Sequence, residues 1–250
     1  MPDEGSKADE RLAPGQFPQT RWSVVLAARG SNDSGHALAA LDELCRAYWF
    51  PLYVYIRRRG VSPEDAEDLT QGYFSALIEK DYLAQADRER GKLRSFLLTT
   101  LKHYLADEWT KASALKRGHG KTAVSIDAAQ AEERYALEPV DEQSPDRLFE
   151  KRWALTLLDN VLEALRADYV GSGQGGLFDV LKKFLAWNSA GEAYREAATE
   201  LGMKENAVRV AVFRMRRRYG DLLRAQVADT VASSEEVSSE VDYLFALLRS

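Results

Sequence analysis

The sequence predicts an all-helical protein, made of two helical domains joined by an acidic flexible linker. Apolar residues recur at helical spacing in each long segment, as at Leu157, Val161 and Leu165. Two of these segments begin with a serine followed by a proline, at Ser62 and Ser144, which is a helix-start signal. The chain has 250 residues and 45% hydrophobic content, which is enough for two cores.

The first domain, residues 17–117, follows a segment at 1–16 whose proline, glycine and acidic residues predict disorder. Gly60 is expected to end one helix of this domain, and Ser62 is expected to cap the next. The expected elements are, in order, a short helix from Thr20, helices over 37–59, 63–80 and 92–116, and a charged loop over 81–90 that precedes the last helix.

Residues 118–144 show little periodicity, which predicts a linker. A second domain at 145–230 follows, and then a tail at 231–250 whose apolar spacing predicts an amphipathic helix. The elements expected in the second domain are a helix over 145–166, a glycine-rich break at 171–176, a helix over 177–187 and a pair of helices within 194–227.

The segment Tyr194–Arg218 has the pattern of a helix-turn-helix. Small Ala198 lets two helices approach each other, and Gly202 can adopt the positive φ that ends the first helix. Val208 is placed to pack the second helix onto the first. The segment therefore predicts a unit that reads DNA.

Six side chains of the second helix face away from Val208 at helical spacing, where they can reach a DNA duplex. Arginine and asparagine form paired hydrogen bonds with base edges, whereas lysine and the trailing arginines suit phosphate. A solvated basic helix in an ordinary helical bundle is the alternative. The candidate duplex-binding residues are Lys204, Asn206, Arg209, Phe213, Arg214 and Arg217.

The formal net charge is −5, but the charges are segregated along the chain. Residues 88–121 hold nine basic and three acidic residues, and residues 204–224 hold seven basic and two acidic residues. Residues 127–150, between them, hold eight acids and two bases. Two basic patches predict two contacts with a polyanion, and the acidic linker either competes for these patches or only solvates itself.

The composition gives little support for an enzyme. Cys45 is the single cysteine, which favours a reducing compartment, and no signal core or membrane-length apolar run is present. The three histidines are too scattered for a zinc site, and no phosphate-binding or dinucleotide-binding glycine pattern occurs. We therefore expect a cytoplasmic protein with no enzymatic activity, metal, cofactor or membrane contact.

The expected helix over 92–116 mixes aromatic and basic residues, including Phe96, Lys102 and Trp109. Such a mixture is typical of a surface that binds single-stranded DNA, because aromatic rings hold unstacked bases and basic groups hold the backbone. The alternative is an ordinary amphipathic helix, and for Phe96 and Trp109 themselves inward packing is the favoured expectation.

In their order and spacing, these segments resemble the bacterial sigma factors of the extracytoplasmic-function (ECF) type, in the sigma-70 superfamily. The resemblance covers most of residues 37–225 and rests on PEDAEDLTQGYFSALI, RSFLLTTLKHYLADEWTKA and YREAATELGMKENAVRVAVFRMRRR. It implies a promoter-specificity factor that binds core RNA polymerase and directs transcription initiation.

By this resemblance the first domain corresponds to region two of the family. Its acidic helix would bind the clamp helices of the largest polymerase subunit through Asp65, Glu67, Asp68, Gln71 and Phe74. The segment after that helix would open and read the minus-ten promoter element through Arg88, Arg90, Lys92, Arg94, Lys102, His103 and Asp107. A surface pair with Lys111 is the alternative role for Asp107.

The second domain would correspond to region four, which reads the duplex minus-thirty-five element and rests on the flap of the second-largest subunit. The chain departs from the family pattern at 20–29, at 169–187 and in its tail from 232 to 250. The tail helix is expected either to dock on a domain and mask it, or only to complete the apolar cover of the second domain.

An anti-sigma factor and a protein kinase are candidate regulators, and Thr70 lies in the polymerase-binding helix, where phosphorylation would add charge. Two other functions stay open. One is a stand-alone helix-turn-helix transcriptional regulator that binds duplex DNA without core polymerase. The other is an interaction protein similar to an anti-sigma factor.

Overall fold

The computed structural model describes residues 34–79, 91–114, 144–185 and 191–249, together with Glu132 and Tyr135. Every regular element among these residues is a helix, so the predicted all-helical class is confirmed for them. Several predictions fall outside the described residues: the disordered segment 1–16, the helix from Thr20, the loop at 81–90 with Arg88 and Arg90, and most of the linker.

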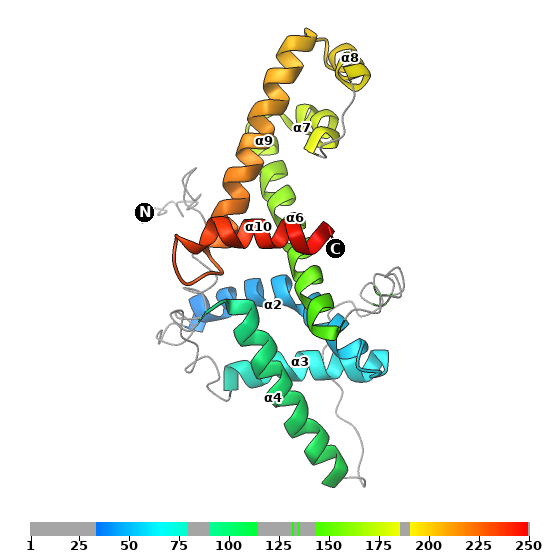
Figure 1. The fold of residues 1–250 in the computed structure, drawn as a ribbon, viewed down its shortest axis with the longest axis vertical. Helices are drawn as coiled ribbons and strands as arrows, with labels where there is room; N and C mark the ends of the chain where they lie inside the picture. The colour runs from blue at the N-terminus through cyan, green and yellow to red at the C-terminus, as the bar shows by residue number, and fades with distance from the viewer. Residues whose placement is uncertain are drawn as a thin grey trace, which may run out of the picture.

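Three helices form the first half of the described fold: α2 (Ser34–Arg57), α3 (Pro63–Glu79) and α4 (Leu93–Ala114) (Figure 1). Each begins and ends within three residues of its predicted limits. Pro51 lies inside α2, where its ring removes one backbone donor, a feature that the sequence interpretation passed over.

The start of α3 follows the predicted capping pattern. Gly60 has a φ of 80°, which lets the chain turn sharply after α2. Ser62 then accepts a hydrogen bond from the amide of Asp65 at 3.1 Å, as an N-cap serine does. The cap satisfies a backbone donor that the first turn of a helix otherwise leaves unpaired.

The second half of the fold begins with a helix longer than predicted. It extends five residues past its expected end at Arg166, and the helix expected over 177–187 ends in a 3-10 turn. The elements are α6 (Pro145–Gly171), α7 (Gly175–Leu181), the 3-10 turn η3 (Lys182–Leu185), α8 (Gly191–Leu201), α9 (Glu205–Ala228) and α10 (Glu236–Arg249).

Helices α8 and α9 are joined by a turn of three residues, with Gly202 at a φ of 62° as the sequence predicted. The amide of Met203 donates to the carbonyl of Ala198 at 2.9 Å, which closes the end of α8. Val208 is fully buried and Val212 is 2% exposed, so the inward face of α9 is the predicted one.

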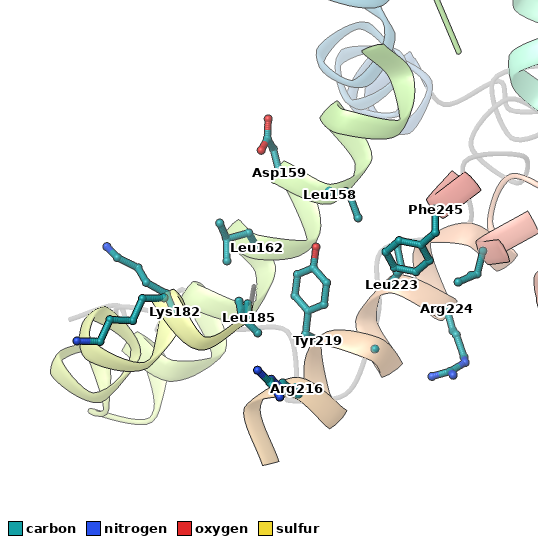
Figure 2. Close-up of a pocket in the computed structure, with 13 residues that line it drawn as sticks. Leu158, Asp159, Leu162, Lys182, Leu185, Arg216, Tyr219, Leu223, Arg224 and Phe245 are labelled. Carbon is teal, nitrogen blue, oxygen red and sulfur yellow. The ribbon is translucent and has the colours of Figure 1, made fainter. Parts of the chain in front are cut away.

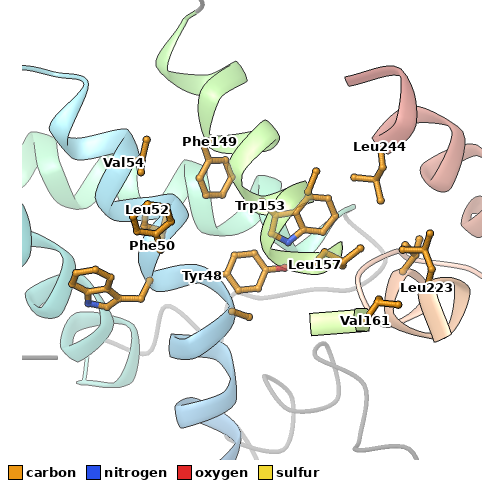
Figure 3. Close-up of a cluster of buried hydrophobic side chains, with 14 of the residues drawn as sticks. Tyr48, Phe50, Leu52, Val54, Phe149, Trp153, Leu157, Val161, Leu223 and Leu244 are labelled. Carbon is orange, nitrogen blue, oxygen red and sulfur yellow. The ribbon is translucent and has the colours of Figure 1, made fainter. Parts of the chain in front are cut away.

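Helix α6 supplies side chains to both halves of the fold. Near its start, Phe149 and Trp153 pack against aromatic and aliphatic side chains of α2, including Tyr48 and Leu52 (Figure 3). Farther along, Val161 faces α9. The buried side chains of the two predicted domains thus form one continuous cluster, with α6 as the shared element; the division into domains at 17–117 and 145–230 stays a prediction.

The predicted tail helix is present as α10, which packs on α6 and α9 (Figure 1). Of the apolar residues that predict this helix, Leu244 is buried and Val237, Val241 and Leu248 pack against the core, whereas Phe245 is 38% exposed. Glu240 and Leu247 are also buried. The connection that precedes α10 also reaches the first half of the fold, since the amide of Leu93 donates to the carbonyl of Thr230 at 3.2 Å.

The expectation for Trp109 on α4 is wrong. Leu97, Leu101 and Leu105 form the buried face of α4, but Trp109 is 42% exposed. The Trp109 ring lies 5.5 Å from the guanidinium of Arg59, a separation typical of a cation–π contact. α4 therefore extends past the helices that cover its first turns, and its end is more exposed than an amphipathic pattern suggests.

Replacement of Gly202 by alanine should lower the free energy of unfolding by about 1 kcal/mol, because a Cβ is unfavourable at positive φ. Urea denaturation measures this loss. The matched control is Gly220→Ala in the interior of α9, where the added Cβ meets only the flexible guanidinium of Arg224 at 3.3 Å. That substitution should stabilise the protein by roughly 0.5–1 kcal/mol; an equal loss in both variants would contradict the role assigned to the turn.

Candidate nucleic-acid interface

The outer face of α9 carries the six residues that the sequence predicted as duplex-binding. Val208, Val212 and Met215 turn one side of the helix into the core, so residues on the opposite side point to solvent. All six predicted side chains are exposed: Lys204, Asn206, Arg209, Phe213, Arg214 and Arg217.

This face also holds exposed apolar side chains. Phe213 is 66% exposed, and Val210, which the sequence analysis did not select, is 49% exposed. A hollow of about 510 Å³ lies beside Asn206, Val210 and Arg214 and extends to α6 and α7. Val210 lies four residues after Asn206 and so shares its helix face, and this spacing could have predicted that Val210 is exposed. The surface thus combines basic, amide and apolar groups.

The arginines of α9 divide into two groups by their contacts. Arg209 lies 2.7 Å from the carboxylate of Glu205 and 4.4 Å from the ring centre of Tyr194, so its guanidinium is held in place. Within the described residues, no ion pair involves Arg214 or Arg217. These two side chains are therefore free to bind an external anion.

Arg216 and Arg218, by contrast, attach α9 to its neighbours. The Arg216 guanidinium donates to the carbonyl of Phe184 at 2.6 Å, and Arg218 lies 2.6 Å from the carboxylate of Asp168. These contacts connect α9 with η3 and with the end of α6. Sequence spacing alone does not separate such structural arginines from the exposed ones.

The start of α4 differs most from its predicted role. Arg94 is 2% exposed, and its guanidinium forms an ion pair with Glu240 of α10, which is 1% exposed. The ammonium of Lys92 lies 2.5 Å from the other carboxylate oxygen of Glu240. A carboxylate from the tail thus lies beside both bases and offsets their charge.

Aromatic rings complete the surroundings of Arg94. Its guanidinium lies 4.7 Å from the ring centre of Trp153 and 5.2 Å from that of Tyr243. The Tyr243 hydroxyl donates to Glu150; burial first, and then this bond, raises the pKa of Tyr243. Because Arg94 is enclosed on these sides, its guanidinium is not accessible to DNA in this conformation.

The other predicted minus-ten residues on α4 lie toward its middle. His103 and Asp107 are exposed, whereas the ammonium of Lys102 lies 2.6 Å from the carboxylate of Asp146 at the start of α6. Lys111, the alternative partner of Asp107, lies 2.7 Å from the carboxylate of Glu108. Asp107 is therefore accessible in this conformation, and Lys102 is engaged by a neighbouring helix.

Glu132, which lies in the segment predicted to be an acidic linker, contacts α2. Arg57 lies 2.8 Å from the Glu132 carboxylate, and the Tyr53 hydroxyl donates to the same group at 2.5 Å. The bond from Arg57, and then the bond from Tyr53, lower the pKa of Glu132. Glu132 is thus held as an anion against a base that belongs to neither of the two basic patches.

The predicted polymerase-binding residues on α3 are only partly accessible. Asp65 and Asp68 are exposed, and the amide of Gln71 donates to the carboxylate of Glu67 at 3.0 Å. Phe74 is 5% exposed, so in this conformation it is a core residue and is not available to a partner. It belongs to the same buried cluster as Leu77.

Thr70 is the candidate phosphorylation site in the same helix. Its side chain is fully buried, and its hydroxyl donates to the carbonyl of Ala66 at 2.6 Å. A kinase therefore has no access to this hydroxyl in the conformation described. The bond is the usual way in which a threonine inside a helix satisfies its hydroxyl.

The two candidate DNA surfaces lie far apart. The start of α9, with α8 beside it, is at one end of the molecule, and α4 is at the other end (Figure 1). α6 spans the distance between them. Any single nucleic acid that contacts both surfaces must extend along the molecule.

The described residues contain no group of three or more histidine, cysteine, aspartate or glutamate side chains that could hold a metal ion. None of the described helices combines the length and the apolar character needed to cross a membrane.

Comparison of the chain with protein-family models, with curated proteins and with solved structures finds no match.

Removal of the Glu240 carboxylate should destabilise the protein strongly. Glu240→Ala leaves Arg94 buried without its main counter-charge, so the free energy of unfolding should fall by about 3 kcal/mol. Urea denaturation measures the change. Asp242→Ala, at an exposed site on the same helix, should change stability by less than about 0.5 kcal/mol. A small effect of Glu240→Ala would contradict the structural role of the ion pair.

Proposed function

We propose that the protein is a promoter-specificity factor of the ECF sigma type. It binds core RNA polymerase and recognises the duplex minus-thirty-five element and the melted minus-ten element of a promoter. The observation that carries the proposal is the exposed outer face of α9, which follows a short glycine turn and carries Arg214 and Arg217, two exposed arginines with no ion pair among the described residues. The proposal also rests on the order of the acidic, basic and helix-turn-helix segments in the sequence.

The chemistry of the α9 face suits duplex DNA. Asn206 and Arg214 present an amide and a guanidinium, groups that form paired hydrogen bonds with adenine and guanine edges in the major groove. Lys204 and Arg217, both exposed, would contact phosphates. Phe213 and Val210 add apolar area that can contact thymine methyl groups. In this proposal, α8 and α9 form the helix-turn-helix.

The exposed acids of α3 support a second contact. Asp65 and Asp68 point to solvent next to the paired Glu67 and Gln71, so this side of α3 presents negative charge to a basic partner. Core RNA polymerase is the proposed partner. Attachment to the polymerase would hold both DNA surfaces near the promoter and raise their effective concentration there.

The contacts of α10 suggest that the free protein adopts a closed state. Glu240 neutralises Lys92 and Arg94, two bases proposed to bind melted minus-ten DNA. The Glu240 carboxylate already pairs with these two bases, and the pair with Arg94 is buried. An external phosphate would therefore have to displace Glu240 in order to bind there. The tail would thus mask the minus-ten surface while its apolar side covers α6 and α9.

The proposal is tested with the purified full-length chain and core RNA polymerase. We expect the two to co-elute in gel filtration and to support promoter-dependent transcription. Failure of both would show that the sigma assignment is wrong. Tight binding of a duplex operator without polymerase would instead favour the stand-alone regulator, which the free outer face of α9 would also allow.

Two substitutions should separate the proposed contacts. Arg214→Ala should reduce transcription that depends on the minus-thirty-five element by about tenfold, through loss of one base contact, and leave polymerase binding intact. Asp68→Ala should weaken co-elution with polymerase and leave duplex binding unchanged. Arg166→Ala, an exposed arginine paired with Glu163 on α6, is the charge-matched control for Arg214. Parallel loss of both functions in either variant would indicate misfolding instead.

The masking role of α10 has a separate test. Glu240→Gln keeps the shape of the side chain but removes the charge that competes with DNA, so the free protein should bind a melted minus-ten oligonucleotide roughly fivefold more tightly at low salt. Fluorescence anisotropy measures this affinity. Asp242→Asn removes the same charge from the exposed side of α10. Equal gains in both variants would mean that only net charge, and not the Arg94 contact, controls binding.

A further inference from the structure

A pocket of about 680 Å³ lies where α6, η3, α9 and α10 meet (Figure 2). None of the residues predicted from the sequence to bind DNA or polymerase lines it. Its volume falls in the range of pockets that enclose small organic ligands, about 300–1,000 Å³. The pocket is therefore a candidate site with a role separate from the α9 outer face.

One part of the pocket wall is apolar. Leu158 and Leu162 come from α6, Leu223 comes from α9, and Val241 and Phe245 come from α10. Phe245 is 38% exposed, so this wall contains aromatic surface that no described residue covers completely. Apolar surface of this kind is stabilised when a ligand removes it from water.

Basic side chains surround the same pocket. Lys182, Lys183, Arg216 and Arg224 line it, against the single acid Asp159. The excess of positive charge produces a potential that attracts an anion.

Lys182 and Lys183 are exposed, and the Arg216 guanidinium donates to the carbonyl of Phe184. Lys182 lies 3.1 Å from Asp179, in an exposed pair between neighbouring turns that is weak in water.

Basic groups lie at both ends of the pocket. Lys182 lies at one end, Arg224 lies with Phe245 at the other, and Tyr219 extends from α9 toward α6 between them (Figure 2). Burial, and then the neighbouring Asp159, raise the pKa of Tyr219 to about 12, so its hydroxyl stays neutral at physiological pH. The neutral Tyr219 hydroxyl therefore does not repel an anion bound in the middle of the pocket.

We propose that this pocket binds a small amphipathic anion, with an apolar body between α6, α9 and α10 and an acidic head group beside Lys182 and Lys183. The inference rests on charge complementarity and on the apolar wall, and it does not depend on the function proposed above. Because Val241 and Phe245 belong to the same helix as Glu240, the bound ligand also holds α10 against the rest of the protein.

The proposal is tested by calorimetric titration of the full chain with decanoate below its micelle concentration. Decanoate should bind with a stoichiometry near one. Decyltrimethylammonium has the same chain with the opposite charge, and butyrate has the head group with little apolar body. Each should bind at least about tenfold more weakly than decanoate, because it lacks one of the two interactions. No binding of decanoate, or equal binding of the cation, would overturn the proposal.

Gly220 offers a direct way to fill the pocket. It lines the cavity from within α9, and a side chain there would first meet only the Arg224 guanidinium. Gly220→Leu should therefore abolish decanoate binding while the helical circular dichroism is retained. Gly176→Leu on α7, where no atom lies within 4 Å of an added Cβ, is the matched control and should bind normally. Binding by Gly220→Leu at the affinity of the unsubstituted protein would overturn the assignment.

A second variant avoids any dependence on core packing. Lys182→Gln combined with Lys183→Gln changes two exposed side chains and should weaken decanoate binding about tenfold without altering thermal stability. Decanoate should also slow amide hydrogen exchange in α10 of the unsubstituted protein. Unchanged affinity in the double variant, or unchanged exchange in α10, would contradict the placement of the ligand. None of these measurements uses DNA or polymerase, so they stand whether or not the protein is a sigma factor.

Discussion

The packing of α6 along its length is the constraint on which the rest of the described fold depends. Near its start, Phe149 and Trp153 are buried against α2, and near its end Val161 and Leu165 are buried beside α9. A helix buried at both ends cannot move relative to one neighbour without exposing apolar surface to the other. The spacing between the α9 face and α4 is therefore set by a rigid element in this conformation, although a linker was expected to separate them.

The basic residues of the chain are divided between internal structure and free surface. Arg94, Arg216 and Arg218 are held by partners in neighbouring elements, whereas Arg214 and Arg217 remain available. This division accounts for an acidic protein that still presents a basic face. Helix α10, which pairs with Arg94, also forms one wall of the pocket between α6, η3 and α9. The same helix therefore both neutralises a buried charge and covers apolar surface.

Much of the fold and of the α9 surface could be predicted because both follow from local spacing. The limits of α3, the turn at Gly202 and the outward direction of Arg214 depend on residues within one or two helical turns. Long-range packing explains the failures. Phe74 and Trp109 each fit two directions in the helical repeat, and only the presence or absence of a neighbouring helix decides which of them is buried.

By itself, the sequence determined the all-helical class of the described chain, the order of its helices and the exposed face of α9, since helical periodicity and turn residues act over short distances. The tertiary structure alone decided that Arg94 is enclosed by Glu240, a partner 146 residues away. It also decided that α10 leaves a pocket beside Phe245. An ion pair or a cavity between distant segments depends on how whole helices pack against one another. The residue spacing within a single helix does not determine that packing.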